Sequence, residues 1–224
     1  MCGRFTITAT FEQLINRFHI ESFLIDDDYL PNYNIAPSQS VIAVINNGTI
    51  NKMGYLRWGL IPPWAKDDKI GYKMINARAE TISEKPSYRN AFKSKRCLIV
   101  ADSFYEWKRH NQNEKTPMRI KLKSNHLFAM AGLWEKWISP EGKPIFSCTV
   151  LTTSANELVQ DIHDRMPVIL KPENEAIWLN PKSSPKELKQ LLKPLDMNLM
   201  EVYEVSSLVN SPQNNSVELI QKIC

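Results

Sequence analysis

The second residue, Cys2, offers the most distinctive chemistry in this sequence. Initiator methionine is generally removed before a small residue, and loss of Met1 would leave an amine and a thiol on the same residue. The α-amine has a pKa of about 7.7–8.0, so an appreciable fraction is a neutral nucleophile near pH 7. An aldehyde would form a Schiff base with it, and the adjacent thiol would close a thiazolidine ring at high effective molarity. The alternative is a cysteine without function that stands at this position by chance.

A second candidate is the phrase from Met74 to Thr81, which contains Asn76 and Arg78. The Asn76 amide can hold an amine or a sugar oxygen by hydrogen bonds. The Arg78 guanidinium can bind a phosphate through two parallel hydrogen bonds. The same phrase is equally compatible with a turn followed by the start of a helix.

Glu106 is a third candidate, because it lies between Tyr105 and Trp107 directly after a predicted strand. Aromatic neighbours desolvate a carboxylate, which raises its pKa and suits it to transferring protons near neutral pH. The alternative is a glutamate at the end of a strand that points into water.

His163 is the best candidate among the histidines, because Asp161, Asp164 and Arg165 surround it with charges that tune its pKa. Arg165 could face a phosphate together with Arg78. The alternative is a structural histidine at the end of a helix.

The charge distribution favours a polyanionic partner. The chain has a net charge of +4, while residues 85–123 hold eleven Lys or Arg against three acidic residues. Such a concentration suits a nucleic acid, although a solvated basic face explains it equally well. We find no CxxC pattern, glycine-rich phosphate loop or dinucleotide fingerprint, so we expect no metal and no cofactor.

The chain contains no apolar run of about 20 residues and no secretory signal, so we expect a protein without a membrane partner in the cytoplasm. In that reducing compartment the four scattered cysteines should remain thiols.

Short β-branched runs predict most of the regular structure. Strands are expected at Val41–Ile45, Cys97–Val100, Met118–Leu122, Leu127–Leu133, Phe146–Leu151, Pro167–Leu170 and Val202–Val205. Helices are expected at Phe11–Phe18 behind a Thr10–Gln13 capping box, from Ser154 toward Asp161, at Glu173–Leu179, and at Leu188–Leu192 behind Ser184 and Pro185. Because strands do not alternate regularly with helices, we expect one α+β domain over residues 1–224, with a mainly antiparallel sheet or barrel-like core and short helices around it.

Six phrases in order resemble the SRAP domain family (SOS response-associated peptidase). They are Met1–Phe5, Tyr33–Pro37, Arg57–Pro62, Asn76–Thr81, Phe104–Trp107 and Ile162–Pro167. The resemblance implies covalent capture of abasic sites in single-stranded DNA, including sites at junctions with duplex, by a monomer that would associate with the nucleoid in a bacterium. One departure is Ala65 after Trp64, where some members carry a second tryptophan.

The resemblance also implies roles for single residues. Cys2 would supply the amine and the thiol, Asn76 would position the amine and the opened sugar, Glu106 would move protons, and His163 would help to open the deoxyribose. The residues implied in DNA binding are Gly3, Arg4, Arg78 and Arg165 at phosphates, and Asn34, Pro37, Trp58, Trp64 and Thr152 along the channel.

Three hypotheses follow from these residues. The first is a DNA–protein crosslinking enzyme with strand cleavage at the abasic site as a side activity. The second is a cysteine peptidase that pairs Cys2 with His163 and acts on other proteins or only on its own Met1. The third is a non-covalent binder of single strands, for which the basic segment and the tryptophans would suffice.

Overall fold

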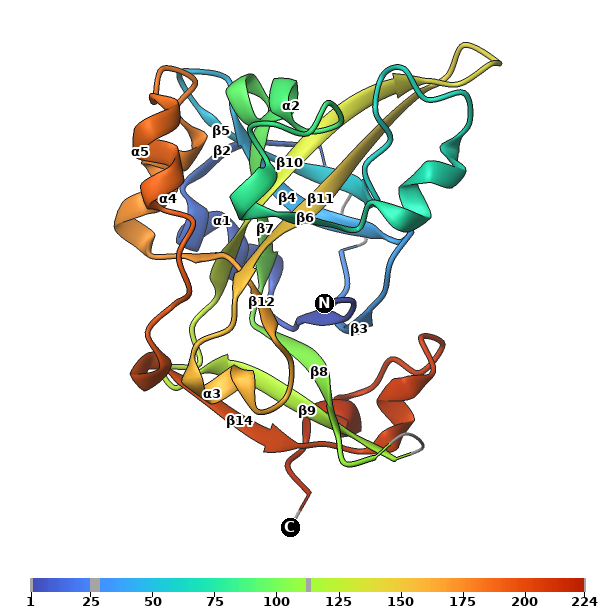
Figure 1. Ribbon diagram of the computed structural model, residues 1–224, viewed down its shortest axis with the longest axis vertical. Coiled ribbons are helices and arrows are strands. Elements are labelled where there is room, and N and C mark those ends of the chain that lie inside the picture. Colours follow the sequence, from blue (N-terminus) through green and yellow to red (C-terminus); the bar gives the residue numbers. More distant parts are fainter. Residues whose placement is uncertain (1, 25–28, 112–113, 224) are drawn as a thin grey trace.

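A computed structural model describes residues 2–24, 29–111 and 114–223. Two β-sheets with short helices around them make up the molecule, and the first described residues lie between the sheets (Figure 1). The expected α+β class with a mainly antiparallel core is therefore confirmed.

Five strands form a closed barrel in the larger sheet. In chain order they are β4 (Ser40–Asn46), β5 (Asn51–Trp58), β7 (Arg96–Ala101), β10 (Phe128–Ile138) and β11 (Pro144–Ser154). They are neighbours in the order β11, β10, β7, β4 and β5, and a parallel pairing of Cys148 with Trp58 joins β5 back to β11. Because closure leaves fewer unpaired strand edges, the barrel is a stable support for the shorter strands that pair with it.

Four shorter strands extend the barrel sheet at its margins. β2 (Ile20–Leu24) pairs with β5, β6 (Asn76–Arg78) and β12 (Arg165–Pro167) pair with β11, and β13 (Ile169–Leu170) pairs with β10. The flanking strands β6 and β12 thus place Asn76, Arg78 and Arg165 beside the same barrel strand, β11.

The second sheet has the order β14 (Met200–Glu204), β9 (Lys115–Leu122), β8 (Ser103–Arg109), β1 (Phe5–Ile7) and β3 (Asn32–Ile35). All its pairings are antiparallel. The N-terminal strand β1 is therefore paired on both sides, which fixes the beginning of the chain.

Each predicted strand overlaps an observed one, although Leu127 and Val205 lie just outside β10 and β14, and one prediction needs correction. The run Pro167–Leu170 was expected to be one strand, but β12 ends at Pro167 and β13 begins at Ile169. The reason is a change of partner, because Pro167 pairs with Thr152 of β11 whereas Leu170 pairs with Ala129 of β10.

The helices follow their capping signals. α1 (Phe11–Phe18) begins at the expected Thr10–Gln13 capping box. α5 (Pro185–Gln190) has the expected N-cap, Ser184, but ends at Gln190 and not at the expected Leu192. α4 (Pro172–Leu179) also matches its prediction, while α2 (Arg89–Ser94) carries no side-chain cap and was not predicted.

The start of α3 (Glu157–Gln160) differs from the prediction. Its N-cap is Asn156, whose side chain accepts a hydrogen bond from the Val159 amide, and not Ser154. Ser154 instead ends β11, where it pairs with Arg165. Pairing with β12 therefore outweighs the capping signal of Ser154.

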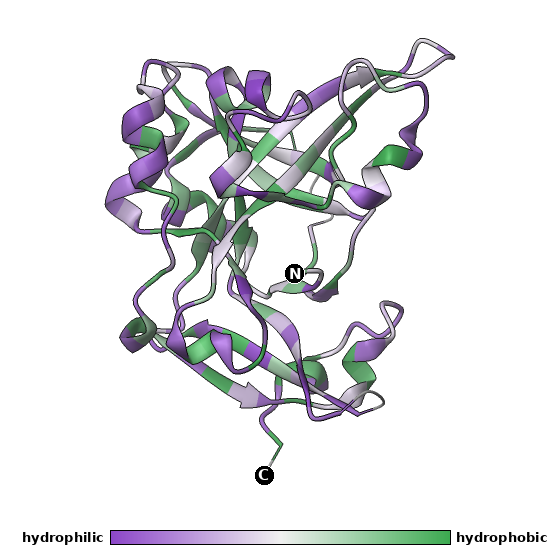
Figure 2. Ribbon diagram, viewed as in Figure 1, coloured by the Kyte–Doolittle hydropathy of each residue, from purple (hydrophilic) through white to green (hydrophobic). Residues whose placement is uncertain are grey.

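Hydrophobic residues follow the barrel strands, while hydrophilic residues gather on the outer turns of helices such as α5 (Figure 2). Inside the barrel Gly132 leaves room for its neighbours, because a Cβ there would lie 2.8 Å from Ile99 Cδ1 and 2.9 Å from Cys97 Sγ. The described thiols Cys2, Cys97 and Cys148 are free and buried. No helix among residues 2–24, 29–111 and 114–223 is long and apolar enough to cross a membrane.

Candidate functional site

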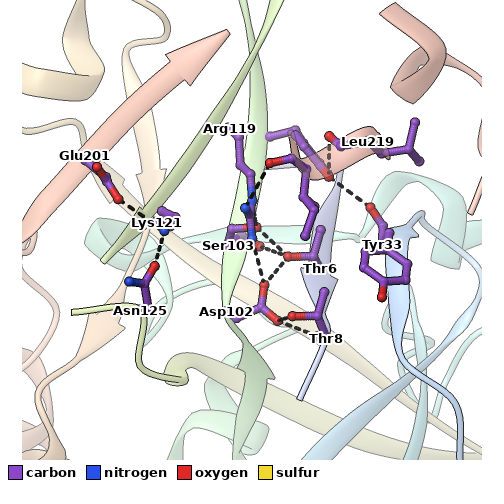
Figure 3. A network of polar contacts seen from close by, with 12 residues as sticks. Thr6, Thr8, Tyr33, Asp102, Ser103, Arg119, Lys121, Asn125, Glu201 and Leu219 are labelled. Atoms are coloured by element: carbon purple, nitrogen blue, oxygen red, sulfur yellow. Dashed lines mark hydrogen bonds and ion pairs between the residues drawn. The ribbon is translucent and has the colours of Figure 1, made fainter. Parts of the chain in front are cut away.

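The N-terminal strand is held in place by a partly buried carboxylate behind it. Asp102 accepts hydrogen bonds from the hydroxyl of Thr6 and from both the amide and the hydroxyl of Thr8 (Figure 3). Arg119 lies 3.5 Å from Asp102 and donates to Ser103 at 2.8 Å. These contacts join β1, β8 and β9, so Cys2 is presented by a strand that is anchored on its neighbours.

Cys2 itself is fully buried. Burial raises the pKa of its thiol well above the usual range, and the nearby charge of Glu106 raises it further. Met1 lies outside the described residues, so its expected removal stays a prediction.

Asn76 is in direct contact with Cys2. Its Nδ2 donates a 2.8 Å hydrogen bond to the Cys2 carbonyl oxygen. The Oδ1 atom of Asn76 is buried and accepts no hydrogen bond from any described residue. The phrase around Asn76 forms strand β6 followed by a short 3₁₀ helix, Ala79–Thr81, which agrees with a turn-and-helix character only in its second half.

Glu106 lies on β8 with only 4% of its surface exposed. Burial raises its pKa from 4.5 to about 7. β1 and β8 pair Phe5 with Phe104, and the same register places Glu106 opposite Gly3. The expectation of a desolvated carboxylate is confirmed, and the alternative of a glutamate facing water is wrong.

His163 follows α3 and makes two competing contacts at Nδ1. The Arg165 amide donates to Nδ1 at 3.0 Å, while Oδ1 of Asp164 lies 2.8 Å from the same atom. Burial lowers the pKa of His163, which favours the neutral ring. A neutral ring that accepts from Arg165 carries its proton on Nε2, so the contact with Asp164 belongs to the protonated ring.

The three arginines expected to bind phosphates differ in exposure and in the protein groups that they already contact. Arg78 is exposed at the end of β6. Arg165 is engaged with Glu80 through hydrogen bonds of 2.8 and 2.9 Å and donates to the Thr152 carbonyl at 2.6 Å. Arg4 is buried and donates to Asn34 Oδ1 at 2.7 Å and to the Val209 carbonyl at 2.6 Å.

The residues expected along a DNA channel likewise divide into exposed and buried ones. Trp64 is 60% exposed, and Gly3 and Pro37 are partly exposed. Trp58 is buried beside Phe5, with ring centroids 5.0 Å apart, and donates from Nε1 to the Ile75 carbonyl. Its ring therefore packs in the core and has no face open for stacking with a base.

Asn34 and Thr152 are also buried and act within the protein. Asn34 Nδ2 donates to the carbonyl oxygens of Ser211 and Asn214, which fixes the C-terminal segment. The Thr152 carbonyl accepts from Arg165. In this structure neither side chain presents a free surface, with exposures of 1% for both.

Two further residues shape the site without having been predicted. Glu80 neutralises Arg165, and Asp102 anchors β1. Glu80 stands in the phrase that carries Asn76 and Arg78, and Asp102 shortly precedes the phrase that carries Glu106, but nothing in a sequence indicates which cation or which strand a carboxylate will meet. Within residues 2–24, 29–111 and 114–223 no cluster of His, Cys, Asp and Glu could hold a metal ion.

The arrangement brings Cys2, Asn76 and Glu106 together from three distant segments just before β1, and comparison with known proteins identifies its class. A family model described as SOS response associated peptidase (SRAP) matches residues 1–212. The chain belongs to the SRAP family.

Relatives in this family are similar over most or all of this chain. The abasic site processing protein YoqW of Bacillus subtilis strain 168 is 63% identical over 222 residues, which cover 99% of each chain. The abasic site processing protein HMCES of Xenopus tropicalis is 33% identical, covering 88% of this chain and 68% of its own. A crystal structure of a protein from Bacteroides thetaiotaomicron has a TM-score of 0.90 at 29% identity, with both chains fully covered.

Proposed function

We propose that this protein processes abasic sites by forming a covalent crosslink between Cys2, freed by removal of Met1, and the ring-opened sugar in single-stranded DNA. The contact between Asn76 and the Cys2 carbonyl supports this proposal most directly. It holds the residue that carries the reactive amine beside a buried carboxyl whose pKa is about 7. The names of the relatives add support, because they process abasic sites.

The chemistry proceeds in two bond-forming steps. The Cys2 amine adds to the aldehyde carbon of the open sugar, and loss of water gives a Schiff base. The thiol then adds to the imine carbon, its proton passes to the nitrogen, and the thiazolidine ring is complete. The first step carries both amine protons to the carbonyl oxygen, which leaves as water, and the second carries the thiol proton to the nitrogen.

Glu106 suits these proton transfers. With a pKa of about 7, it is present in both protonation states near neutral pH, so it can give a proton to the departing hydroxyl and accept one from the thiol. The neutral ring of His163 would assist opening of the deoxyribose. If the Schiff base is not closed by the thiol, β-elimination from it cleaves the strand as a side reaction.

DNA would reach the site past exposed groups. Arg78 would bind a phosphate, and Trp64 would stack on a base. Gly3 and Pro37 would lie along the backbone path, while Arg4, Asn34, Trp58 and Thr152 would support this surface from beneath. Arg165 would join after a rearrangement.

The peptidase hypothesis has less support. A nucleophilic cysteine of a peptidase needs a lowered thiol pKa beside a protonated histidine. Here burial raises the pKa of Cys2 and lowers that of His163. Both shifts disfavour a thiolate–imidazolium pair. Removal of its own Met1 would need only one turnover.

The test is intact-mass spectrometry before and after incubation with a single-stranded oligonucleotide that contains one abasic site. We expect a protein without Met1 and an adduct whose mass is the sum of both partners minus one water. Cys2→Ala should form no stable adduct, and the matched variant Cys148→Ala, which removes a buried barrel thiol, should react like the wild type. A stable adduct with Cys2→Ala, or none with the wild type lacking Met1, would overturn the proposal.

A second variant separates the two steps. Cys2→Ser keeps the amine but replaces the thiol, so borohydride should trap its Schiff base while no stable adduct survives without reduction. Cys2→Ala keeps the same amine and should be trapped by borohydride in the same way. Absence of a borohydride-trapped adduct in both variants would show that the amine is not the nucleophile, and the order of steps would then be wrong.

A further inference from the structure

The guanidinium of Arg165 is occupied by protein groups in this structure. Glu80 accepts from Nη1 and Nη2 at 2.8 and 2.9 Å, and the Thr152 carbonyl accepts from Nη2 at 2.6 Å. The remaining donor, Nε, is buried and meets no acceptor in the described part of the chain. The Arg165 side chain is 14% exposed, whereas that of Glu80 is 51% exposed.

A carboxylate and a phosphate bind arginine in the same way. Each accepts two parallel N–H···O hydrogen bonds from the guanidinium edge. Glu80 therefore fills the position that a phosphate would need, and its negative charge repels an approaching phosphate. The solvent-facing side of Glu80 leaves it room to rotate away, because half of its side chain lies in water.

A second cation lies close to this pair. Arg78 is exposed, and strand pairing places it opposite Thr152, the residue whose carbonyl binds Arg165. The hydrogen bonds from Arg165, together with the charge of Arg78, hold the pKa of Glu80 below its usual value. Glu80 thus remains ionised and keeps its hold on Arg165 at neutral pH.

We propose that Glu80 occupies Arg165 as an internal substitute for a DNA phosphate, so that Arg165 contacts DNA only after the DNA has displaced Glu80. This inference rests on the proposed function, because it takes the DNA backbone as the ligand. Arg78 makes the first phosphate contact, and the exchange at Arg165 follows. Glu80 therefore lowers the affinity of the protein for any single strand.

The test measures equilibrium binding of a fluorescein-labelled, undamaged single-stranded oligonucleotide, on which no crosslink forms. Glu80→Gln removes the charge that competes for Arg165 and should bind about two- to fivefold more tightly than the wild type, which is the range that the loss of one exposed ion pair allows. The slope of log affinity against log salt should steepen by about 0.7, because one more phosphate contact forms. Unchanged or weaker binding with an unchanged slope would overturn the inference and make Glu80 a residue that holds Arg165 ready for DNA.

A double-mutant cycle tests whether Glu80→Gln tightens binding only because it removes a negative charge that repels the DNA. In an Arg165→Gln background, Glu80→Gln should no longer tighten binding. An equal gain in both backgrounds would show that Glu80 acts by its charge alone, and the inference would be wrong. Thermal unfolding of each variant shows whether it is folded.

Glu80→Asp provides a test that does not depend on the stability of the Arg165 variant. The shorter side chain keeps the charge but cannot span both terminal nitrogens of Arg165 from the same backbone position. We expect tighter binding and a steeper salt slope than in the wild type, although the net charge is the same. Binding equal to that of the wild type would contradict competition through Arg165.

The crosslinking assay separates the two proposals. If the wild type forms the Cys2 adduct but Glu80→Gln and Glu80→Asp bind DNA like the wild type, only the competition is wrong. If the wild type neither binds single-stranded DNA nor forms the adduct, both proposals are wrong.

Discussion

The side-chain amide of Asn76 donates a 2.8 Å hydrogen bond to the backbone carbonyl oxygen of Cys2. Asn76 lies on β6, which pairs with barrel strand β11 through Val150. Cys2 precedes β1, which belongs to the second sheet. This single contact therefore ties the segment that leads into one sheet to the other sheet.

Loss of this contact should slow crosslinking. Asn76→Ala removes the donor, and we expect adduct formation to slow roughly two- to tenfold, which corresponds to one lost neutral hydrogen bond. Asn76→Asp should be slower still, because a carboxylate would face the Cys2 carbonyl oxygen and repel it. The measurement is the initial rate of adduct formation on a denaturing gel. Equal rates for Asn76→Asp and the wild type would show that the contact does not position Cys2.

The sequence predicts individual helices and strands more readily than the way in which they pair and pack. Capping boxes at Thr10 and Ser184 located α1 and α5, because the hydrogen bonds involved are local. Closure of the barrel depends on the pairing of Cys148 with Trp58, which are 90 residues apart in sequence. No local pattern encodes such a contact.

The sequence of residues 85–123 likewise does not show which of its charges lie at the surface. Residues 85–123 contain eleven cations, but Arg96 and Arg119 are buried. Arg96 donates to carbonyl oxygens such as those of Trp178 and Asn180, and Arg119 binds Tyr203. These two charges stabilise the fold and are not presented to a polyanion, so a count of charges overstates the basic surface.

Glu106 should make stability depend on pH. Burial raises its pKa from 4.5 to about 7, so the folded protein binds more protons than the unfolded chain between these values. The stabilisation is complete below about pH 4.5 and is lost as the pH rises through about 7, by up to about 3 kcal/mol. We expect wild-type stability to fall relative to Glu106→Gln between pH 5 and pH 8 in urea unfolding. A difference that is constant with pH would mean that Glu106 has the pKa of an exposed glutamate.

The contribution of His163 to stability should change with pH in the direction opposite to that of Glu106. Burial lowers its pKa, so its contribution to stability is present above the unfolded pKa of about 6.5 and is lost as the pH falls through the folded value. His163→Gln should therefore lose less stability on acidification than the wild type does. Chemical-shift titration of the His163 ring by NMR provides the check, and a midpoint above about 6.5 would contradict it.

Trp58 and Trp64 should respond in opposite ways to replacement by alanine. Trp58 is 1% exposed, so Trp58→Ala leaves a core cavity and should lower the free energy of unfolding by about 3–5 kcal/mol. Trp64 is 60% exposed, so Trp64→Ala should leave stability unchanged but weaken binding of single-stranded DNA by about 1–3 kcal/mol for one lost stacked base. Thermal unfolding and fluorescence anisotropy distinguish the two effects. Normal DNA affinity in Trp64→Ala would exclude stacking on this ring.

Asp102 should stabilise the reactive strand, although it lies behind the site. Its carboxylate accepts from both groups of Thr8 and from Thr6, and the side chain is only 10% exposed. Asp102→Asn removes the charge that these donors and Arg119 face, so the free energy of unfolding should fall by about 1.5–3 kcal/mol, the range for hydrogen bonds to a charged group. Thr8→Val, which removes a single hydroxyl donor, should cost about 1 kcal/mol. Because Cys2 lies just before β1 (Phe5–Ile7), exchange of the β1 amides with deuterium should accelerate more in Asp102→Asn than exchange of the β10 amides does. Equal acceleration in both strands would show that Asp102 stabilises the whole fold and not the N-terminal strand.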